Sequence, residues 1–425
     1  MAALSQPYGR TGGSSFRVES GRARRVAPTA DGARPRLLRM RLLHTSDWHV
    51  GRSFHGRDLL ADQAAVLGAI ADLVVAERVD AVLVAGDLYD RALPSAEAVR
   101  VCGEALGRIR AAGAQIIVIA GNHDSAARLG FGADFLSAGG LHVRSDPARA
   151  ADPVLVRDAH GEVAVYGVPY LEPDTARHVL GVPDCRGHEG VLGAAMDAVR
   201  ADLAGRPGAR SVVLAHAFVA GGDASDSERR IAVGGVETVP AGVFEGADYA
   251  ALGHLHGAQQ PDAARAWLRY SGSPLAYSFS EARHVKSVWL VDLDAGGLAD
   301  MRRHPLPVPR QLSTLVGRLD DLLADPAHAG VEEHYLSVTL TDRARPLEAM
   351  RRLRDRFPHA VTLEWQPEGG LRTDVVPPRV GGAERDDVTV AAGFVEYVRN
   401  TPADDGERAL LEGAFAALRV AEAAR

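Results

Sequence analysis

The sequence is poor in cysteine and lacks any long apolar run. Only two cysteines, Cys102 and Cys185, occur among 425 residues, which is too few for a disulfide framework or a thiolate metal site. No apolar stretch reaches the roughly 18 residues that a membrane-spanning helix needs, and the arginine-rich N-terminus has no apolar signal-peptide core. We therefore expect a cytoplasmic protein with reduced thiols and no membrane association.

Net positive charge is also missing. The formal charge is −7, and residues 1–39 contribute eight arginines against one glutamate and one aspartate, a balance of +6 that leaves −13 for the rest of the chain. An acidic body argues against a broad basic surface for DNA. It does not exclude phosphate substrates, because bound divalent cations change the charge locally.

The first 39 residues differ in composition from the rest. They are rich in Gly, Ser, Pro, Ala and Arg without periodicity, which indicates a disordered basic extension. Met40 stands directly before the first expected strand, so we expect residues 1–39 to be a misassigned start or a dispensable tail. A basic arm that contacts nucleic acid is the alternative.

From Met40 onward, apolar strands alternate with helices. The pattern predicts strands at Arg41–Thr45, Ala81–Ala85, Gln115–Ala120, Val163–Val168, Ser211–Ala215 and Tyr249–Leu252, and helices at Leu59–Arg78 and Ala96–Ala112. Nearly continuous apolar strands separated by helices indicate an α/β fold whose sheet is covered on both faces.

The pattern changes beyond about residue 280. We expect a strand at Lys286–Asp292, a helix at Leu312–Leu323, a strand at His334–Leu340, a helix at Leu347–Phe357 and a strand at Ala360–Trp365. No cluster of candidate ligands falls in this run, which indicates an accessory domain. Residues 367–388 have linker composition, and two amphipathic stretches follow at Val390–Arg399 and Glu407–Ala423.

Five short polar motifs follow the expected strands of the first part. They are Ser46-Asp47-Trp48-His49, Gly86-Asp87-Leu88-Tyr89-Asp90, Gly121-Asn122-His123-Asp124, His216 and Gly253-His254-Leu255-His256. Each motif alone is more often a turn or a surface residue, but loops outside the carboxyl ends of strands form the sites of α/β sheets. Mixed carboxylate, imidazole and amide ligands suit Mn, Fe or Zn. A shared carboxylate would hold two ions about 3.5–4 Å apart.

These motifs resemble those of the calcineurin-like metallophosphoesterases. The longer stretch of sequence around these motifs resembles, more narrowly, the SbcD family, the nuclease subunits of SbcCD complexes. It comprises LLHTSDWHVGR at 42–52, VAGDLYD at 84–90, IAGNHDS at 119–125, Ser225–Phe244, YAALGHLH at 249–256 and YSGSPLAYSF at 270–279. The resemblance runs from about Met40 to the C-terminus. It implies a sandwich of mixed sheets flanked by helices, with a smaller α+β capping domain and C-terminal helices.

The resemblance also implies a domain plan. Residues 40–279 would be the nuclease domain, 280–378 a capping domain that orients DNA, and 379–425 a linker and C-terminal helices that dock onto the SMC-like ATPase SbcC. Two apolar faces suit such docking, with packing onto the chain's own domain as the alternative. They consist of Phe394, Val395 and Val398, and of Leu411, Phe415 and Leu418 with Leu410 alongside. Homodimerisation is expected from the family.

The family pattern implies a role for each motif residue and two divalent metal ions, with Mn²⁺ as the expected ion. The first ion would be held by Asp47, His49, Asp87 and His256. The second would be held by Asp87, Asn122, His216 and His254, with Asp87 bridging. His123 would face the scissile phosphate without binding metal, and would protonate the leaving 3′-oxygen or stabilise charge. Water activated by the metals would be the nucleophile.

Asp90 departs from the archaeal relatives, which often have a histidine at this position. Ser/Thr protein phosphatases have an aspartate there, followed by arginine, as in Asp90-Arg91. We expect Asp90 to orient His123, with a helix-capping role as the alternative. Arg91 would contact phosphate or lie solvated at the surface. Arg52 and His55 are candidates for DNA contact, against ordinary loop polarity.

The resemblance therefore implies an Mn-dependent DNA phosphodiesterase that works with an ATPase in DNA repair, recombination and replication. Its expected activities are 3′-to-5′ exonuclease on duplex ends and endonuclease on single strands or hairpins. One alternative is a cyclic-nucleotide phosphodiesterase or protein phosphatase of the same superfamily, for which a capping domain and C-terminal helices are unnecessary. The other is an inactive scaffold in a repair complex, against which the full ligand set and His123 argue.

Overall fold

The computed structural model describes residues 39–229, 238–368, 386–399 and 401–423. The expected N-terminal extension, apart from Arg39, and most of the expected linker lie outside these residues. So does part of the Ser225–Phe244 stretch.

Two mixed sheets form the larger part of the described chain. The first has the strand order β15-β14-β1-β4-β5-β6. In it, β1, β4, β5 and β6 pair in parallel, and β14 pairs antiparallel with both β1 and β15. Its strands are β1 (Met40–Thr45), β4 (Ala81–Val84), β5 (Gln115–Ile119), β6 (Leu141–Arg144), β14 (Ser287–Asp294) and β15 (Gly297–Pro305).

The second sheet has the order β13-β12-β9-β8-β7, in which only β7 is antiparallel to its neighbour. Its strands are β7 (Val154–Asp158), β8 (Gly161–Val168), β9 (Arg210–His216), β12 (Tyr249–Gly253) and β13 (Leu268–Tyr270). The two sheets pack face to face, because Leu42 of β1 and Val212 of β9 belong to one buried apolar cluster.

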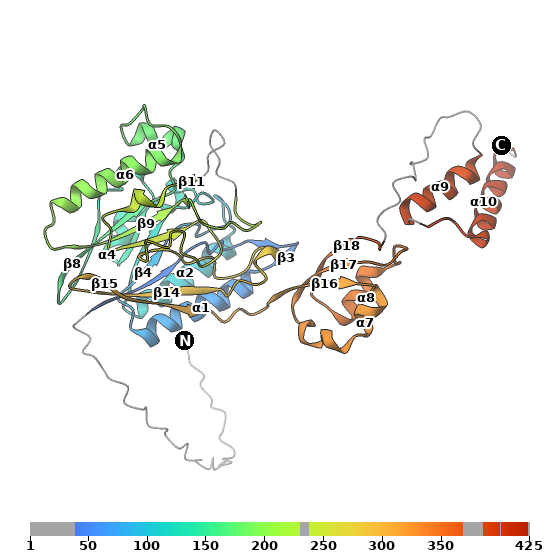
Figure 1. Cartoon of the computed structure of the whole chain (residues 1–425), viewed down its shortest axis with the longest axis horizontal. Helices are drawn as coiled ribbons and strands as arrows, with labels where there is room; N and C mark the ends of the chain where they lie inside the picture. The colour runs from blue at the N-terminus through green and yellow to red at the C-terminus, as the bar shows by residue number, and fades with distance from the viewer. Residues whose placement is uncertain (1–38, 230–237, 369–385, 400, 424–425) are drawn as a thin grey trace, which may run out of the picture. The chain divides into compact units, whose positions relative to one another are not determined.

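Helices cover the outer face of each sheet. Consecutive residues of a strand point to opposite faces, so Leu43 packs with Leu67 of α1 (Leu60–Glu77) while Leu42 faces the other sheet. The helix α2 (Ala96–Ala111) joins α1, and α5 (Pro173–Val179) and α6 (Gly187–Ala204) cover the second sheet. Figure 1 shows α6 and α1 on opposite sides of the strands. The predicted α/β sandwich flanked by helices is confirmed.

A smaller module follows the two sheets. It has three parallel strands, β16 (Leu312–Gly317), β17 (Tyr335–Leu340) and β18 (Ala360–Trp365), with the helices α7 (Leu319–Ala324) and α8 (Ala349–Arg356). It has its own apolar core, to which Leu336, Leu353 and Phe357 contribute with no exposed surface. We call residues 312–365 the small domain.

Two expectations about this region were wrong. The predicted helix at Leu312–Leu323 is the strand β16 followed by the short helix α7, because Leu312 and Leu315 are buried at a spacing of three that imitates a helix. The boundary expected at residue 280 falls too early, since β14 pairs with β1 and belongs to the first sheet.

The last described elements are the helices α9 (Asp387–Arg399) and α10 (Asp405–Ala423), which pack against each other. Large apolar side chains remain exposed on both, and Phe394 and Leu418 are more than half exposed. Within the described ranges, no helix has the length and apolar character needed to span a membrane.

His44 is a buried histidine between the two sheets that is not part of a motif. The Nε2 atom of His44 lies 3.1 Å from the carbonyl oxygen of Leu252, and Nδ1 lies 2.9 Å from the hydroxyl of Tyr249. A carbonyl oxygen only accepts, so Nε2 donates to Leu252 and Nδ1 accepts from Tyr249. Burial lowers the pKa of His44 to about 3.

His44 should make the stability of the protein sensitive to acid. Its folded pKa lies below the unfolded value, so its contribution is complete above the unfolded pKa of about 6.5 and is lost as the pH falls below that value. We expect the free energy of unfolding, measured with urea in EDTA, to fall by about 1.4 kcal/mol for each pH unit of acidification because of this group. The variant His44→Gln keeps a donor and an acceptor without titrating, and should show a correspondingly shallower pH dependence. Equal slopes in the two proteins would contradict this assignment.

Candidate metal centre

Five strand ends bring the polar motifs together. Residues 46–49, 86–90 and 121–124 follow β1, β4 and β5, which are parallel neighbours in the first sheet. His216 ends β9, and residues 254–256 follow its parallel neighbour β12 in the second sheet. The carboxyl ends of parallel neighbours share one edge, so the two sheets place all five motifs at one end of the sandwich.

The backbone at this end adopts unusual conformations. Among the described residues, seven non-glycine residues have positive φ, and four of them are Asp47, His49, Asp87 and His254. Left-handed φ at such residues costs on the order of 1–3 kcal/mol each, so the surrounding contacts hold these side chains against local preference. Gly253 is required by close approach, since a Cβ atom there would lie 1.9 Å from the carbonyl oxygen of Ala85.

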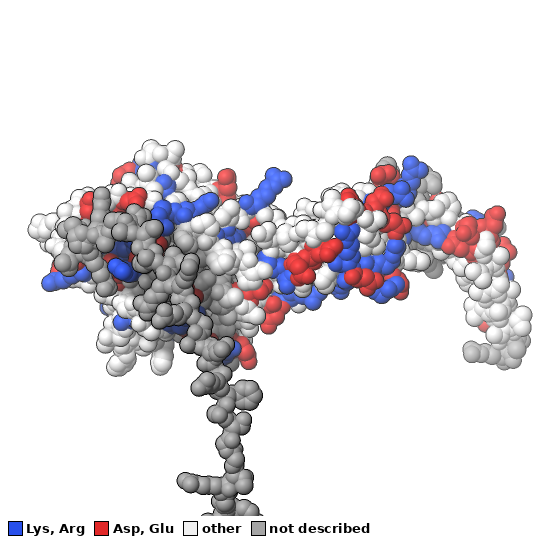
Figure 2. Space-filling view, turned by 90° about the horizontal axis from the view of Figure 1, so that it is seen from below, with Lys and Arg blue, Asp and Glu red and all other residues white. Residues whose placement is uncertain are grey.

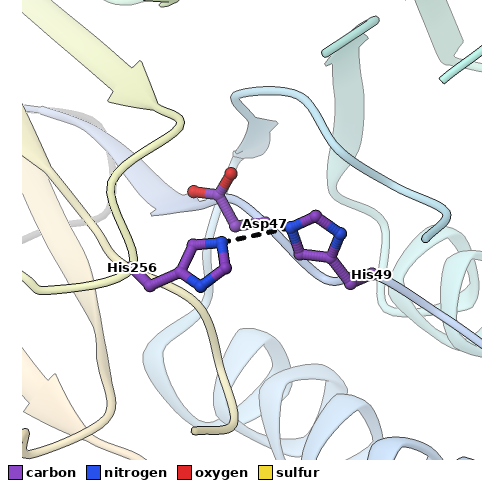
Figure 3. Close-up of side chains that lie close together, drawn as sticks. All are labelled: Asp47, His49 and His256. Atoms are coloured by element: carbon purple, nitrogen blue, oxygen red, sulfur yellow. Dashed lines mark hydrogen bonds between the residues drawn. The ribbon is translucent and has the colours of Figure 1, made fainter. Parts of the chain in front are cut away.

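The first ligand group consists of Asp47, His49 and His256, all buried. One ligand atom from each lies within 4.8 Å of the others, and Figure 3 shows the rings of His49 and His256 facing each other with Asp47 beside them. The two Nε2 atoms of His49 and His256 are 3.2 Å apart. Two nitrogen ligands about 2.1 Å from one ion and at right angles to each other would be separated by about 3 Å, so this spacing fits a shared ion.

The second group surrounds His216. Its Nδ1 lies 2.9 Å from the carbonyl oxygen of Ala85, so Nδ1 donates and Nε2 keeps a lone pair. That Nε2 lies 2.9 Å from Oδ1 of Asn122, which is also 3.2 Å from Nδ1 of His254. The Nδ2 atom of Asn122 is buried without a partner. Nε2 of His216 and Oδ1 of Asn122 therefore face each other as two acceptors without a hydrogen between them, as two ligands of one ion would.

Asp87 lies between the two groups. Its Oδ2 atom is 3.5 Å from Nε2 of His49 and 3.5 Å from Nε2 of His216. Asp47, Asp87 and His216 also form a compact trio of candidate ligand atoms. A single carboxylate oxygen placed equally between one histidine of each group has the position that a bridging ligand needs.

The charges of the site favour cations. Burial, together with the neighbouring Asp87 carboxylate, raises the pKa of Asp47 well above its ordinary value. Burial also raises the pKa of Asp87 to about 6. The pKa values of the histidines shift in the opposite direction, and burial lowers the pKa of His216 to about 4. Buried carboxylates close together and neutral imidazoles are stabilised by bound divalent ions, so the residues present fit a metal pair.

His123 lies beside the metal groups and differs from them. Its backbone N–H donates to Oδ1 of Asp87 over 2.8 Å, and its ring nitrogen Nδ1 is 2.9 Å from the carbonyl oxygen of Asp90. Because that carbonyl only accepts, Nδ1 carries the hydrogen and Nε2 is available. The residue is half-buried, unlike His49 and His256. This is the position expected of a group that meets the substrate.

Asp90 contacts His123, but not in the way we expected. The hydrogen bond runs to the main-chain carbonyl oxygen of Asp90, while one oxygen of its carboxylate lies 3.7 Å from Nδ1 of His49. The same oxygen lies 3.7 Å from Nε of Arg52. The Nδ1 atom of His49 is buried and has no hydrogen-bond partner. The carboxylate of Asp90 therefore faces the metal group, and its peptide orients His123.

The three basic side chains singled out near the motifs occupy different environments. Arg52 is largely buried. Its guanidinium lies 5.0 Å from the ring centre of Tyr277, and Nη2 donates to the carbonyl of Ser227 over 2.9 Å. Its Nη1 is buried without a partner. His55 is exposed, and the side chain of Arg91 is 80% exposed at 3.7 Å from Asp90. Arg52 alone of these three has a fixed position beside the site.

Sequence reasoning missed the residues that support the motifs. Asp124 accepts hydrogen bonds from the backbone N–H groups of Gly121, Leu88 and Tyr89, and so joins two ligand loops. Its place within a motif could have drawn attention to it. Ser227, Glu281 and Lys286 connect to His256 through buried hydrogen bonds. No spacing in the sequence links these three residues to His256, so their contacts become visible only in the folded chain.

Metal affinity should depend on pH through Asp87. The pKa of this carboxyl is raised to about 6 without metal, so above pH 6 it is ionised, and below pH 6 an ion must displace its proton. We expect the dissociation constant of Mn²⁺ to rise about tenfold per pH unit below pH 6. Calorimetric titrations at pH 5, 6, 7 and 8 would measure this. An affinity that stays constant down to pH 5 would contradict the expected protonation of the site.

The fold and the site together define a class of protein, the metal-dependent phosphoester hydrolases. The family model described as calcineurin-like phosphoesterase matches residues 40–258, about half of the chain. The protein belongs to the calcineurin-like phosphoesterase family, whose members use divalent metals.

The chain is also similar to two solved structures at low sequence identity. One is TT1561 of Thermus thermophilus, with 14% identity, a TM-score of 0.37, and coverage of 63% of this chain and 99% of the other. Another is a dimetal phosphatase from Danio rerio, LOC 393393, with 12% identity, a TM-score of 0.34 and the same coverage of both chains.

Proposed function

We propose that the protein is the nuclease subunit of an SbcCD-type complex, a two-metal DNA phosphodiesterase that uses Mn²⁺. It would act as a 3′-to-5′ exonuclease on duplex ends and as an endonuclease on single strands and hairpins, in DNA repair, recombination and replication. The cytoplasm is the compartment in which this function would operate. The proposal rests on the family, on the two ligand groups that share Asp87, and on the resemblance of the sequence stretches between residues 42 and 279 to the SbcD family.

The residues of the site suit hydrolysis of a phosphodiester. Bound divalent ions would supply an activated water and neutralise charge on the phosphate. Hydrolysis forms a bond between the water oxygen and phosphorus and breaks the bond from phosphorus to the 3′-oxygen, which needs a proton. His123 presents Nε2 on a half-buried ring whose orientation is held by Asp90. In its protonated form this ring would donate the proton to the leaving 3′-oxygen.

A cavity lies beside the ligand candidates. A cavity of about 430 Å³ is bordered by the ligand candidate His254 and by Phe218, Ser225, Glu228 and Arg229. On the face drawn in Figure 2, acidic and basic side chains are intermixed over the described residues. The proposal therefore assigns the broader hold on DNA to a partner and the cleavage to this chain.

Two modules outside the sandwich are the observation that most favours DNA over a small substrate. The small domain has its own core, and α9 and α10 expose apolar side chains such as Phe394 and Leu418. Hydrolysis of a cyclic nucleotide would require neither module. We propose that the small domain orients DNA, and that α9 and α10 dock onto an SMC-like ATPase, SbcC, whose activity would make cleavage ATP-dependent. A homodimer of this chain is the proposed assembly.

The test is a cleavage assay with Mn²⁺ on hairpin-ended duplex DNA, with the protein alone and with its ATPase. We expect cleavage that requires Mn²⁺ and is stimulated by ATP only when the ATPase is present. Cyclic nucleotides and a phosphopeptide serve as competing substrates. Turnover of either of these without cleavage of DNA would contradict the proposal and favour the other members of the family.

A further inference from the structure

One metal-ligand candidate, His256, is enclosed by a buried polar network of residues that are not themselves ligand candidates. Its backbone N–H donates to Oε1 of Glu228 over 2.7 Å, and its carbonyl oxygen accepts from Nζ of Lys286 over 2.9 Å. Its ring nitrogen Nδ1 lies 2.6 Å from the hydroxyl of Ser227. Hydrogen bonds therefore fix both the main chain and the side chain of His256.

The network continues from Ser227 to a buried ion pair. The hydroxyl of Ser227 lies 2.6 Å from Oε1 of Glu281, whose other oxygen pairs with Lys286. Glu281 is 1% exposed and Lys286 is 5% exposed. A buried ion pair contributes little to stability on average, because desolvation opposes the attraction between the charges. Its presence beside a ligand candidate therefore calls for a role other than stability.

The donors of Lys286 are fully used. Its ammonium group has three hydrogens, and three acceptors surround it: the carbonyl of His256, the hydroxyl of Ser273 and the carboxylate of Glu281. Ser273 donates its own hydrogen to the carbonyl of Leu275 over 2.7 Å, so its oxygen can only accept from Lys286. The ammonium group can therefore only be a donor within the network.

The carboxylate of Glu281 is likewise surrounded by donors. Oε1 accepts from the backbone N–H of Tyr277 over 3.0 Å and from the hydroxyls of Ser227 and Ser278. The other oxygen, Oε2, pairs with the ammonium group of Lys286, and together these donors keep the carboxylate ionised. An ionised carboxylate only accepts. Two oxygens 2.6 Å apart need a hydrogen between them, which Ser227 must supply.

These assignments fix the proton on His256. If the hydroxyl hydrogen of Ser227 points to Glu281, its oxygen must accept from Nδ1 of His256. The neighbouring Ser225 hydroxyl, 3.0 Å from that of Ser227, donates to Glu228 over 2.6 Å, so it leaves this direction unchanged. We infer that Lys286, Glu281 and Ser227 are positioning residues that hold His256 as its Nδ1–H tautomer, with the lone pair of Nε2 directed at the first metal position.

The two ligand groups differ in what sets the tautomer of their histidines. The second group obtains the same tautomer at His216 from a main-chain carbonyl, that of Ala85, which no side-chain substitution removes. In the first group, His256 depends on the side chains of Ser227, Glu281 and Lys286, which come from two separate segments. Loss of Ser227 or Glu281 should therefore weaken one metal position and spare the other. The inference rests on the proposed metal site but not on the substrate, since it concerns the protein without DNA.

The direct test is the tautomer of His256 in metal-free protein. Long-range ¹H–¹⁵N correlation spectra of ¹⁵N-histidine-labelled protein, with the His256 signal assigned by a His256→Gln variant, should show a protonated Nδ1 and an unprotonated Nε2 at pH 7.5. Ser227→Ala should abolish this single tautomer. A wild-type His256 protonated at Nε2 would overturn the inference, whatever the protein cleaves.

A second readout is Mn²⁺ binding, followed by the EPR signal of free Mn²⁺. Support from a hydrogen-bonded neighbour is worth about 10–100-fold in metal affinity. We expect Ser227→Ala and Glu281→Gln to weaken one of the two sites by that factor and to leave the other within about threefold. Equal weakening of both sites, or no weakening, would overturn the inference, because a general loss of structure does not discriminate between the sites.

The matched controls lie at the opposite end of β9. Ser211 is buried and donates its hydroxyl to Asp248 over 3.1 Å, and Arg210 forms a buried ion pair with Asp158. Ser211→Ala and Arg210→Met remove a buried hydroxyl and a buried ion pair of the same kinds. Both should lower thermal stability while keeping the wild-type affinity at both metal positions and the tautomer of His256.

Discussion

Replacing Asp87 with asparagine should abolish two-metal binding and reduce phosphodiester hydrolysis on the order of 10⁴-fold. The side-chain oxygen that accepts from the backbone N–H of His123 would be kept, while the charge placed 3.5 Å from both His49 and His216 would be lost. The expected result is a protein that binds at most one Mn²⁺ per chain by calorimetry. No other single ligand should have so large an effect, because each other ligand serves one position.

The stability of the same variant separates a metal role from a structural one. In the metal-free protein, Asp87 raises the pKa of Asp47, which means that the two carboxylates repel each other. We therefore expect Asp87→Asn to be at least as stable as the wild type in EDTA, and to gain no stability when Mn²⁺ is added. The control Asp248→Asn, at the opposite strand ends, should lose stability and keep its activity. If Mn²⁺ stabilised Asp87→Asn as much as it stabilises the wild type, a bridging role of Asp87 would be contradicted.

Replacing His123 with asparagine should lower kcat about 10²–10⁴-fold while leaving metal stoichiometry and KM nearly unchanged. The ring of His123 is held by the carbonyl oxygen of Asp90, and it is the backbone N–H that donates to Asp87. The metal pair should therefore form normally in the variant. Single-turnover cleavage of DNA, together with a Mn²⁺ titration, would measure both quantities.

The choice of substrate distinguishes proton donation by His123 from stabilisation of charge. A nitrophenyl phosphodiester has a leaving group that departs without a proton, so the variant should lose less than about tenfold on it. Stabilisation of charge on the phosphoryl group would give similar losses on both substrates. An equal rate of the variant and the wild type on DNA would remove His123 from the reaction altogether.

The convergence of the motif residues was predictable because it depends on local pattern and on strand topology. Asp47, Asp87 and Asn122 each follow a buried strand, and His216 and His254 end or follow two more. Parallel strands bring such residues to one edge regardless of the rest of the fold. The sandwich itself was predictable for a related reason, since strands such as Ala81–Val84 are buried on both faces and need two covering layers.

The remaining features depend on contacts between distant segments, which a single sequence does not encode in a readable form. The strand β14 joins the first sheet by pairing with β1, which lies near the start of the described chain, so the expected boundary at residue 280 was misplaced. Asp90 uses its peptide oxygen rather than its carboxylate toward His123, a choice that is set by loop geometry. Lys286 and Glu281 meet His256 only after folding.

Whether two ions share Asp87 is tested most directly by anomalous X-ray scattering from crystals of the full chain loaded with Mn²⁺. The expected result is two anomalous peaks about 3.5–4 Å apart. One should lie among Asp47, His49 and His256 and the other among Asn122, His216 and His254, with the Asp87 carboxylate between them. A single peak, or peaks away from these side chains, would contradict the two-metal site on which the proposed hydrolysis depends.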